Sequence, residues 1–455
     1  MKHVKTQVCV VGAGSGGTGC VYRLIKNNIK TVVVDKYPDF GGTMTFCGVD
    51  GWEPGVSLSG IHTILKDELE KMPSACHVVE VVPNCNIFNP ENGYNCENHS
   101  FKNYPWGLSI PTGKTYEETL GRCKSIRGDS SMKRFQFEPD KMCRAIRNVL
   151  SPYKENLTEY FDYSFESCTT ANGKITSVTV SDKEEKVKIE ADFFVDATGD
   201  IILAREAECD HTFGSEAKSL YNEPCATKES DSINAVSYVF RAEKRKDSEG
   251  IDEIPPEYLT ADIEKWKDEK MKRVVSFVVM YPCGDLCINM LPTMEGNEYF
   301  NLGERADYIG KARVYAYWHY LQTQKNMQGY TLKHIYSAGV REGYRLRGKY
   351  VLTENDIRAG KAVSLNSIGV AAIADHALDI HGNSEMTGEL EIPYEIPIEC
   401  TMTKEYENLM VASRGASFSH IASSSVRLSR TILSLGESVG EYISKKIKNG
   451  GFENE

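Results

Sequence analysis

A glycine-rich turn near the start of the 455-residue chain constrains the fold more than any other feature. Residues 7–11 are strand formers and lead into Gly12, and Gly14 and Gly17 complete the spacing GxGxxG. Apolar residues at helical spacing follow, and a second strand-like run ends at Asp35. This order of strand, glycines, helix, strand and acid predicts a βαβ unit of a parallel sheet.

Each of these positions has a physical reason to hold its residue. Gly12 permits a tight turn from strand to helix, Gly14 lets a pyrophosphate approach the backbone, and Gly17 allows close packing of helix on strand. The free N–H groups and the dipole at the helix start favour phosphate, and Asp35 is placed to accept hydrogen bonds from a ribose. The pattern therefore predicts a dinucleotide site.

Composition and charge exclude several classes of protein. Hydrophobic residues make up 41% of the chain and charged residues 26%, as in folded globular proteins rather than disordered ones. The net charge of −11 disfavours nucleic acid as a partner, and no apolar run is long enough for a membrane span. The N-terminal residues show no signal-peptide pattern, so we expect a cytoplasmic protein with reduced thiols. The 14 cysteines include no CxxC pair, and we expect no metal site.

The next residues indicate which dinucleotide binds. Residues 35–43 hold an acid, Lys36, a short spacer, and then two glycines ending at Gly42, followed by Thr43. This stretch resembles the flavin-binding extension of glutathione-reductase-like FAD proteins. Its continuation to Gly55 resembles the family called FAD-dependent oxidoreductase, which includes xanthan-lyase-associated flavoproteins. The resemblance implies FAD as cofactor, with Lys36, Gly42 and Thr43 in its site.

Two later segments fit the same family. A run of strands, residues 160–189, precedes a strand that ends in Ala197, Thr198, Gly199 and Asp200, which resembles the second flavin signature. Residues 408–414 then resemble the family's C-terminal strand and Arg414 loop, although Ser413 stands where the family has glycine. A long helix is expected after it, and its start at residues 423–425 would direct N–H groups of Ser424 and Ser425 at the flavin pyrimidine.

These segments predict an α/β protein with a discontinuous FAD-binding domain of the Rossmann type, a parallel sheet plus a β-meander. Residues 1–214 and 395–455 would form that domain, and residues 215–394 an inserted α+β substrate domain. Residues 235–241, 274–281 and 286–290 read as its strands, and 305–321 as a helix whose aromatic residues we assign to the core.

Candidate catalytic residues follow the same resemblance. His420 follows the loop expected to face the flavin, and imidazole titrates near neutral pH, so we expect it to move the substrate proton. Arg414 and Arg427 are candidates for stabilising an anion. Arg341 and Arg345 could bind an anionic or polyhydroxyl substrate, or could instead form an internal ion-pair network.

Other side chains leave alternatives open. His376 and His381 are candidates for substrate contact or proton transfer, with a structural role as the alternative. Cys47 lies near the position of the redox pair of disulfide reductases but has no partner at CxxxxC spacing, so thiol–disulfide chemistry is not expected.

The leading interpretation is an FAD-dependent oxidoreductase transferring a hydride between flavin N5 and a small polar organic substrate with a hydroxyl or amine group. The resemblance points to carbohydrate-related or acidic metabolites. A reductase of activated C=C bonds, with Arg414 or Arg341 as proton donor, is one alternative, and a non-catalytic flavin-binding protein is another. The electron donor or acceptor, the direction of reaction and the oligomeric state stay open.

Overall fold

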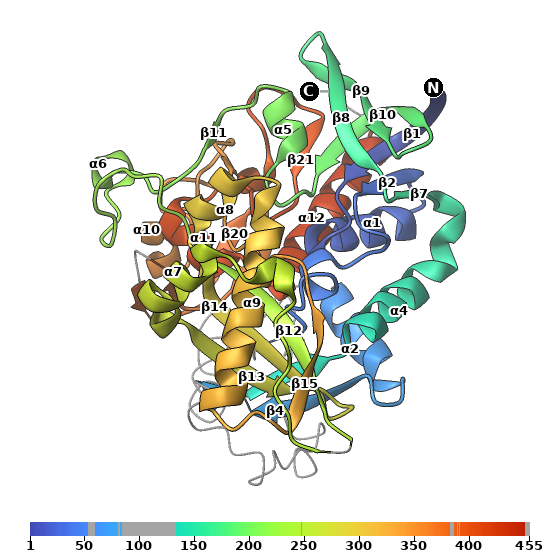
Figure 1. The fold of residues 1–455 in the computed structure, drawn as a ribbon. Coiled ribbons are helices and arrows are strands. Elements are labelled where there is room, and N and C mark those ends of the chain that lie inside the picture. The colour runs from blue at the N-terminus through green and yellow to red at the C-terminus, as the bar shows by residue number, and fades with distance from the viewer. Residues whose placement is uncertain are drawn as a thin grey trace.

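The computed structural model describes residues 1–52, 60–80, 82–83, 133–246, 248–382, 386–388, 390 and 392–450. Residues 53–55, the end of the stretch that resembles the flavoprotein family, lie outside them. Figure 1 shows a parallel sheet with helices α1 and α12 in the upper right, and a second sheet with helix α9 in the lower half.

The first sheet is built from segments far apart in the chain. Four strands pair in parallel in the order β7-β2-β1-β10, and β21 pairs in parallel with the end of β10. The strands are β1 (Lys2–Val11), β2 (Thr31–Asp35), β7 (Leu157–Phe161), β10 (Lys186–Asp196) and β21 (Leu409–Val411). This arrangement confirms the predicted α/β fold.

The predicted meander extends this sheet. β8 (Ser164–Ala171) and β9 (Lys174–Ser181) form an antiparallel hairpin, and β9 pairs with the first half of β10. Asn172 and Gly173 both have positive φ, at 51° and 70°, which is the backbone that the Asn-Gly turn predicts.

Two long helices pack against each other beside the sheet. α1 (Ser15–Lys26) follows the glycine turn, and α12 (Ser429–Lys448) comes from the far end of the chain. They approach closely because glycines face each other, since a Cβ on Gly436 would lie 1.9 Å from the carbonyl oxygen of Gly16. The remaining helices of this half are α2 (Gly60–Glu70), α4 (Pro139–Leu150), α5 (Ile202–Glu206), α10 (Glu354–Ala359) and α11 (His420–Val426).

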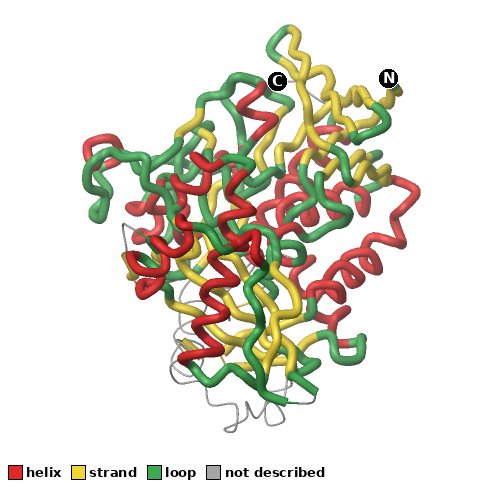
Figure 2. The backbone as a smooth tube through the Cα atoms, in the orientation of Figure 1, coloured by secondary structure: helices red, strands yellow, loops and turns green. Residues whose placement is uncertain are grey.

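A second, antiparallel sheet has the order β15-β12-β14-β13-β5. Its strands are β5 (Val82–Pro83), β12 (Val236–Lys244), β13 (Val275–Met280), β14 (Leu286–Met294) and β15 (Tyr330–Ile335). α9 (Arg305–Gln324) runs along it (Figure 2), and the shorter helices α6 (Lys218–Tyr221), α7 (Ala261–Glu269) and α8 (Gly296–Leu302) complete this half. Tyr317 and Trp318 of α9 are buried in its core, as predicted.

Within the described ranges, short strands form four smaller sheets. β3 (Gly51–Trp52), β6 (Lys133–Phe137) and β4 (Cys76–Glu80) form one small sheet, and three further pairs form others. The pairs are β11 (His211–Thr212) with β16 (Arg345–Leu346), β17 (Val370–Ala374) with β20 (Tyr394–Pro397), and β18 (Leu378–Ile380) with β19 (Met386–Gly388).

Core packing divides the chain differently from the expected boundary at residue 394. The second hydrophobic core holds residues 236–330, whereas Leu346, Ile357 and Tyr394 pack in the core of the parallel sheet. The segment 346–394, expected in the insertion, therefore packs with the first half, because its apolar side chains belong to that core and β17 packs on α12. No helix in the described ranges is long and apolar enough to cross a bilayer.

Candidate cofactor and substrate site

The glycine turn has the geometry that its spacing predicts. Gly12 has a φ of 104°, and a Cβ there would lie 2.6 Å from the carbonyl carbon of Ala197. A Cβ on Gly17 would lie 1.9 Å from the carbonyl oxygen of Gly12, so this glycine allows close packing. Gly14, at the start of α1, has no atom within 4 Å of its Cβ position. The turn is therefore closely packed against protein at Gly12 and Gly17 and leaves open space at Gly14.

Asp35 lies at the end of β2 and braces this turn. Its carboxylate accepts backbone N–H groups of Ala13 at 2.5 Å and Tyr37 at 2.8 Å. Burial raises the pKa of the carboxyl, and these N–H groups oppose the rise. A carboxylate has about four acceptor positions, so a ribose hydroxyl can still donate to it.

A second carboxylate, absent from the predicted set, organises the loop after β10. Buried Asp196 accepts the backbone N–H groups of Thr198 at 3.0 Å and Ala204 at 2.9 Å, and the Thr198 hydroxyl at 2.6 Å. Burial raises the pKa of Asp196 to about 6. The signal was present in the sequence, since an acid stands directly before the Ala-Thr-Gly-Asp run.

Arg414 lies against that loop. A Cβ on Gly199 would lie 2.0 Å from Arg414 Nη1, so the glycine makes room for the guanidinium. Arg414 Nη2 also donates to Asp200 Oδ1 at 3.2 Å. The two carboxyl ends of β10 and β21 are thus joined at one edge of the sheet, where open parallel sheets bind ligands.

A cavity of about 420 Å³ opens at this edge, within the size range of ligand sites. Thirteen of the predicted site residues line it: Gly12, Gly14, Asp35, Lys36, Gly42, Thr43, Ala197, Thr198, Gly199, Asp200, Arg341, Arg414 and Arg427. Residues that the sequence did not indicate also line it: Trp52, Arg134, Ser237, Tyr299, Ser429 and Arg430. These additional residues reach the cavity through strand pairing and through segments that come back to the sheet late in the chain. No local sequence motif indicates them.

The structure differs from the prediction at the C-terminal helix. The chain forms two helices there, because α11 ends at Val426 and α12 begins at Ser429. The helix start that lines the cavity is that of α12, at Leu428, Ser429 and Arg430. The expected start at Ser423–Ser425 therefore lies inside α11, which begins at His420, and several residues before the start of α12.

Ser424 and Ser425 are consequently buried inside α11 and are not among the residues that line the cavity. The Ser424 hydroxyl donates to the carbonyl oxygen of Ile421 at 2.7 Å. The Ser425 hydroxyl donates to the carbonyl of His376 at 2.5 Å and pairs with the hydroxyl of Tyr394. The Ser424 hydroxyl also accepts the backbone N–H of Asp379 at 3.2 Å, so both side chains fasten α11 to neighbouring segments.

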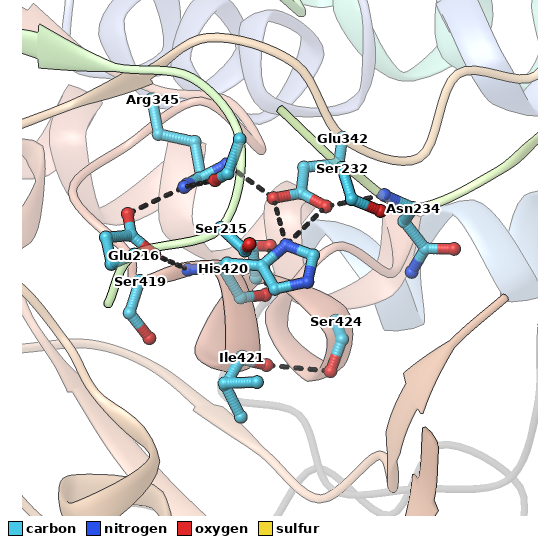
Figure 3. A network of polar contacts seen from close by, with 12 residues as sticks. Ser215, Glu216, Ser232, Asn234, Glu342, Arg345, Ser419, His420, Ile421 and Ser424 are labelled. Carbon is cyan, nitrogen blue, oxygen red and sulfur yellow. Dashed lines mark hydrogen bonds and ion pairs between the residues drawn. The ribbon is translucent and has the colours of Figure 1, made fainter. Parts of the chain in front are cut away.

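His420 also lies away from the cavity lining, in a buried ionic network (Figure 3). Its Nδ1 contacts the two carboxylate oxygens of Glu342 at 2.9 and 3.1 Å. Arg345 joins this carboxylate to that of Glu216, whose other oxygen accepts the His420 backbone N–H at 2.8 Å. Although burial opposes it, the charges of His420 and Arg345 lower the pKa of Glu342. Here the ion-pair alternative holds for Arg345.

The two other histidine candidates make protein contacts. His376 Nδ1 lies 2.7 Å from the carbonyl oxygen of Ala377, and His381 Nε2 lies 2.8 Å from Asp379 Oδ2. Neither is among the residues that line the cavity.

Cys47 lines the cavity as a neutral thiol. Burial raises its pKa to about 11, so little thiolate forms near neutral pH. The cysteines in the described part of the chain are all free.

Comparison with known proteins now identifies the family. A model of the family described as "FAD dependent oxidoreductase" matches residues 7–451. The chain belongs to this family. It is therefore an enzyme that uses FAD as its cofactor, and the open backbone at Gly14, the N–H groups at the start of α1 and the acid Asp35 fit that dinucleotide.

Curated relatives of this FAD-dependent oxidoreductase match over short stretches. The glutamate synthase [NADPH] small chain of Halomonas elongata is 50% identical over 40 residues, which are 9% of this chain and 8% of that protein. The corresponding protein of Escherichia coli is 39% identical over 46 residues, 10% of each chain.

Solved structures match over nearly the whole chain at low identity. A geranylgeranyl bacteriochlorophyll reductase-like protein from Thermoplasma acidophilum is 12% identical with a TM-score of 0.49, covering 99% of this chain and 81% of that one. The flavin-dependent brominase Bmp2 is 11% identical with a TM-score of 0.46, over 99% and 81%.

Proposed function

We propose that this oxidoreductase transfers a hydride between flavin N5 and a small polar organic substrate bearing a hydroxyl or amine group. When bound, FAD supplies the two-electron chemistry. The observation that carries the proposal is the shared cavity: its lining includes the glycine turn at Gly14 and also Ser237 and Arg341 from the second half. The cavity therefore joins the dinucleotide turn to residues of the second half that could face a substrate.

The chain's own residues would divide into holding and orienting groups. Gly14 and the start of α1 would hold the pyrophosphate, and Asp35 a ribose hydroxyl. The start of α12 at Ser429 would place its positive end beside the flavin pyrimidine, in the role first expected of Ser424 and Ser425. Arg414 and Arg341 would contact the substrate.

The position of His420 favours an indirect role over the direct proton transfer that the sequence suggested. The imidazole contacts Glu342, and the residue next to Glu342 in the chain is Arg341, which lines the cavity. We therefore assign His420 as a positioning residue that acts through Glu342 on the segment that carries Arg341.

Arg341 also favours a second candidate function, the reduction of an activated C=C bond. Burial and the nearby charge of Arg427 lower the pKa of Arg341 to about 9, which makes it a stronger acid than an ordinary arginine. An acid at the cavity wall suits the delivery of a proton to a carbon that receives a hydride.

The first test is the visible spectrum of the purified protein, followed by that of the filtrate after denaturation. A two-band flavin spectrum with FAD released into the filtrate is the expected result. Anaerobic mixing with alcohol and amine donors should then bleach the flavin, whereas unsaturated acceptors should reoxidise flavin reduced beforehand. Protein that stays colourless after incubation with FAD would refute the proposal.

A further inference from the structure

Three guanidinium groups from separate parts of the chain meet at the same cavity. Arg134 comes from β6, Arg341 from the segment after β15, and Arg427 from the junction between α11 and α12. They act on each other electrostatically, because the positive charges of Arg427 and Arg134 both disfavour the charged form of Arg341. This group is called the arginine cluster below.

Arg341 has no carboxylate partner within the described residues. Its Nη1 donates to the carbonyl oxygen of Ala235 at 3.2 Å and to the hydroxyl of Ser237 at 3.0 Å. Its hydrogen bonds use Nη1 alone, and Nε is buried without a partner in the described structure. Neutral groups thus hold the guanidinium of Arg341, and its Nη2 is available to donate to a ligand.

The other two arginines have few carboxylates around them that could neutralise the cluster. Arg427 Nη2 donates to Asp379 Oδ2 at 2.8 Å, and that carboxylate also contacts His381. Among the described residues, Arg134 donates only to the carbonyl oxygen of Gly51, from Nη2 at 3.5 Å, and its charge also acts on the nearby Asp50 carboxylate. Across the described part of the cluster, three guanidiniums therefore share one contacting carboxylate, so positive charge is in excess.

The excess of positive charge in the cluster disfavours the charged form of Arg341. Burial and the charge of Arg427 lower its pKa to about 9, the opposite of what an ion-pair partner does. A bound anion would remove this penalty. Other cavity arginines are already neutralised, since Arg414 pairs with Asp200 and Arg430 with Asp375.

The cluster comes from other segments than the groups suited to the FAD phosphates. The glycine turn and the start of α1 offer N–H groups for phosphate, whereas Arg341 donates to Ala235, just before β12, and to Ser237 within it. Trp52 lines the same cavity and gives an apolar wall for a carbon skeleton.

We infer that the arginine cluster binds a carboxylate of the organic substrate, so the substrate of this oxidoreductase is a small organic acid. The inference rests on the proposed function, and it narrows the substrate from polar molecules in general to carboxylates. Guanidiniums suit this role because their planar N–H groups match carboxylate oxygens.

The test uses FAD-loaded protein, so that the cofactor phosphates already occupy their own site. Succinate is titrated while the visible flavin spectrum is recorded, and the uncharged diamide succinamide and inorganic phosphate are titrated in parallel. We expect a saturable spectral shift with succinate and none with succinamide or phosphate.

Variants assign the shift to the cluster. Arg341→Gln and Arg134→Gln should each weaken succinate binding by about 10- to 100-fold, and Arg341→Lys by less because it keeps the charge. Arg144→Gln on the exposed face of α4 removes the same charge at a residue that is not among those lining the cavity, and it should leave the affinity unchanged. Thermal unfolding midpoints of the FAD-loaded variants show which ones are folded for comparison.

Several outcomes would overturn the inference. These are a spectrum that succinate does not change, equal shifts with succinamide, a response to phosphate alone, or equal affinities in Arg341→Gln and Arg144→Gln. Failure of the proposed function looks different, because no alcohol or amine donor would then bleach the FAD-loaded protein, whatever succinate does to its spectrum. If the flavin-loaded protein oxidises a neutral alcohol and does not bind succinate, the inference of a carboxylate substrate is wrong and the proposed function stands.

Discussion

Arg341 and Glu342 are consecutive residues whose side chains lie in different environments. Arg341 lines the cavity, whereas Glu342 is 2% exposed and is bound by His420, Arg345 and the backbone N–H of Asn234. The buried ionic network therefore fixes the backbone of the segment from which the cavity arginine projects.

Substitution of His420 tests this positioning role. His420→Ala leaves one bond of the buried Glu342 carboxylate unmade, which should lower the free energy of unfolding by about 1–3 kcal/mol. It should also weaken succinate binding through Arg341. His420→Asn offers an amide N–H near the position of Nδ1 and should recover part of both losses.

The measurements are thermal unfolding, succinate titration, and the rate of flavin reduction by a substrate once one is found. If His420→Asn reduces that rate severely while stability and succinate affinity stay at wild-type values, His420 acts directly on the substrate proton and the positioning role is wrong.

Two glycines of the same turn should give opposite phenotypes. Gly14→Ala adds a methyl group where no protein atom lies within 4 Å, so the apoprotein should fold with wild-type stability and lose FAD affinity. Gly17→Ala places a Cβ 1.9 Å from the Gly12 carbonyl oxygen and should destabilise the apoprotein by about 1–3 kcal/mol. Chemical denaturation of apoprotein and fluorescence titration with FAD separate the two effects. Tight FAD binding by Gly14→Ala would contradict the pyrophosphate assignment.

A buried acid predicts a pH-dependent contribution to stability. Asp50 accepts hydrogen bonds from Tyr281 and Gln136, and burial raises its pKa to about 6, above its value in the unfolded chain. The native state therefore holds this proton more tightly, and the stabilisation is present below about pH 4 and is lost as pH rises through about 6.

Asp50→Asn should lack this term. Relative to wild type, the variant should gain about 2 kcal/mol in the free energy of unfolding between pH 4 and pH 7. Urea denaturation at several pH values measures the difference, and Asp192→Asn at an exposed position is the control. A difference that does not vary with pH would place the ionisation of Asp50 outside this range.

The thiol of Cys47 should be unreactive in the folded protein. Because burial raises its pKa to about 11, iodoacetamide at pH 8 should leave Cys47 unmodified in the native state and alkylate it after unfolding in guanidinium. Mass spectrometry of peptides containing Cys47 measures both. Rapid native alkylation that also stops flavin reduction would return Cys47 to the list of redox candidates.

Local sequence patterns predicted those parts of the site whose geometry depends on residues close together in the sequence. The turn from Gly12 to Gly17 and the end of β2 at Asp35 are of this kind, because spacing along one strand and one helix sets their geometry. Most of the predicted cavity lining comes from such segments.

Residues placed by long-range packing could not be predicted in this way. Arg134 reaches the cavity only because β6 pairs with β3, and no pattern around it shows that pairing. His420 was misplaced because a serine-rich run hides the break between α11 and α12. Ser419, whose side chain accepts the N–H of Ala422, was the available sign of an earlier helix start.

The pairing of β21 with β10 has a consequence for how the protein is made. Phe194 lies opposite Leu409, and the backbone of Gly436 lies against Gly16. During translation, the N-terminal βαβ unit leaves the ribosome long before the strand and helix that cover it. A nascent chain that ends within the inserted half would expose the apolar sides of β10 and α1, so newly made protein should depend on chaperones until the C-terminal segment arrives.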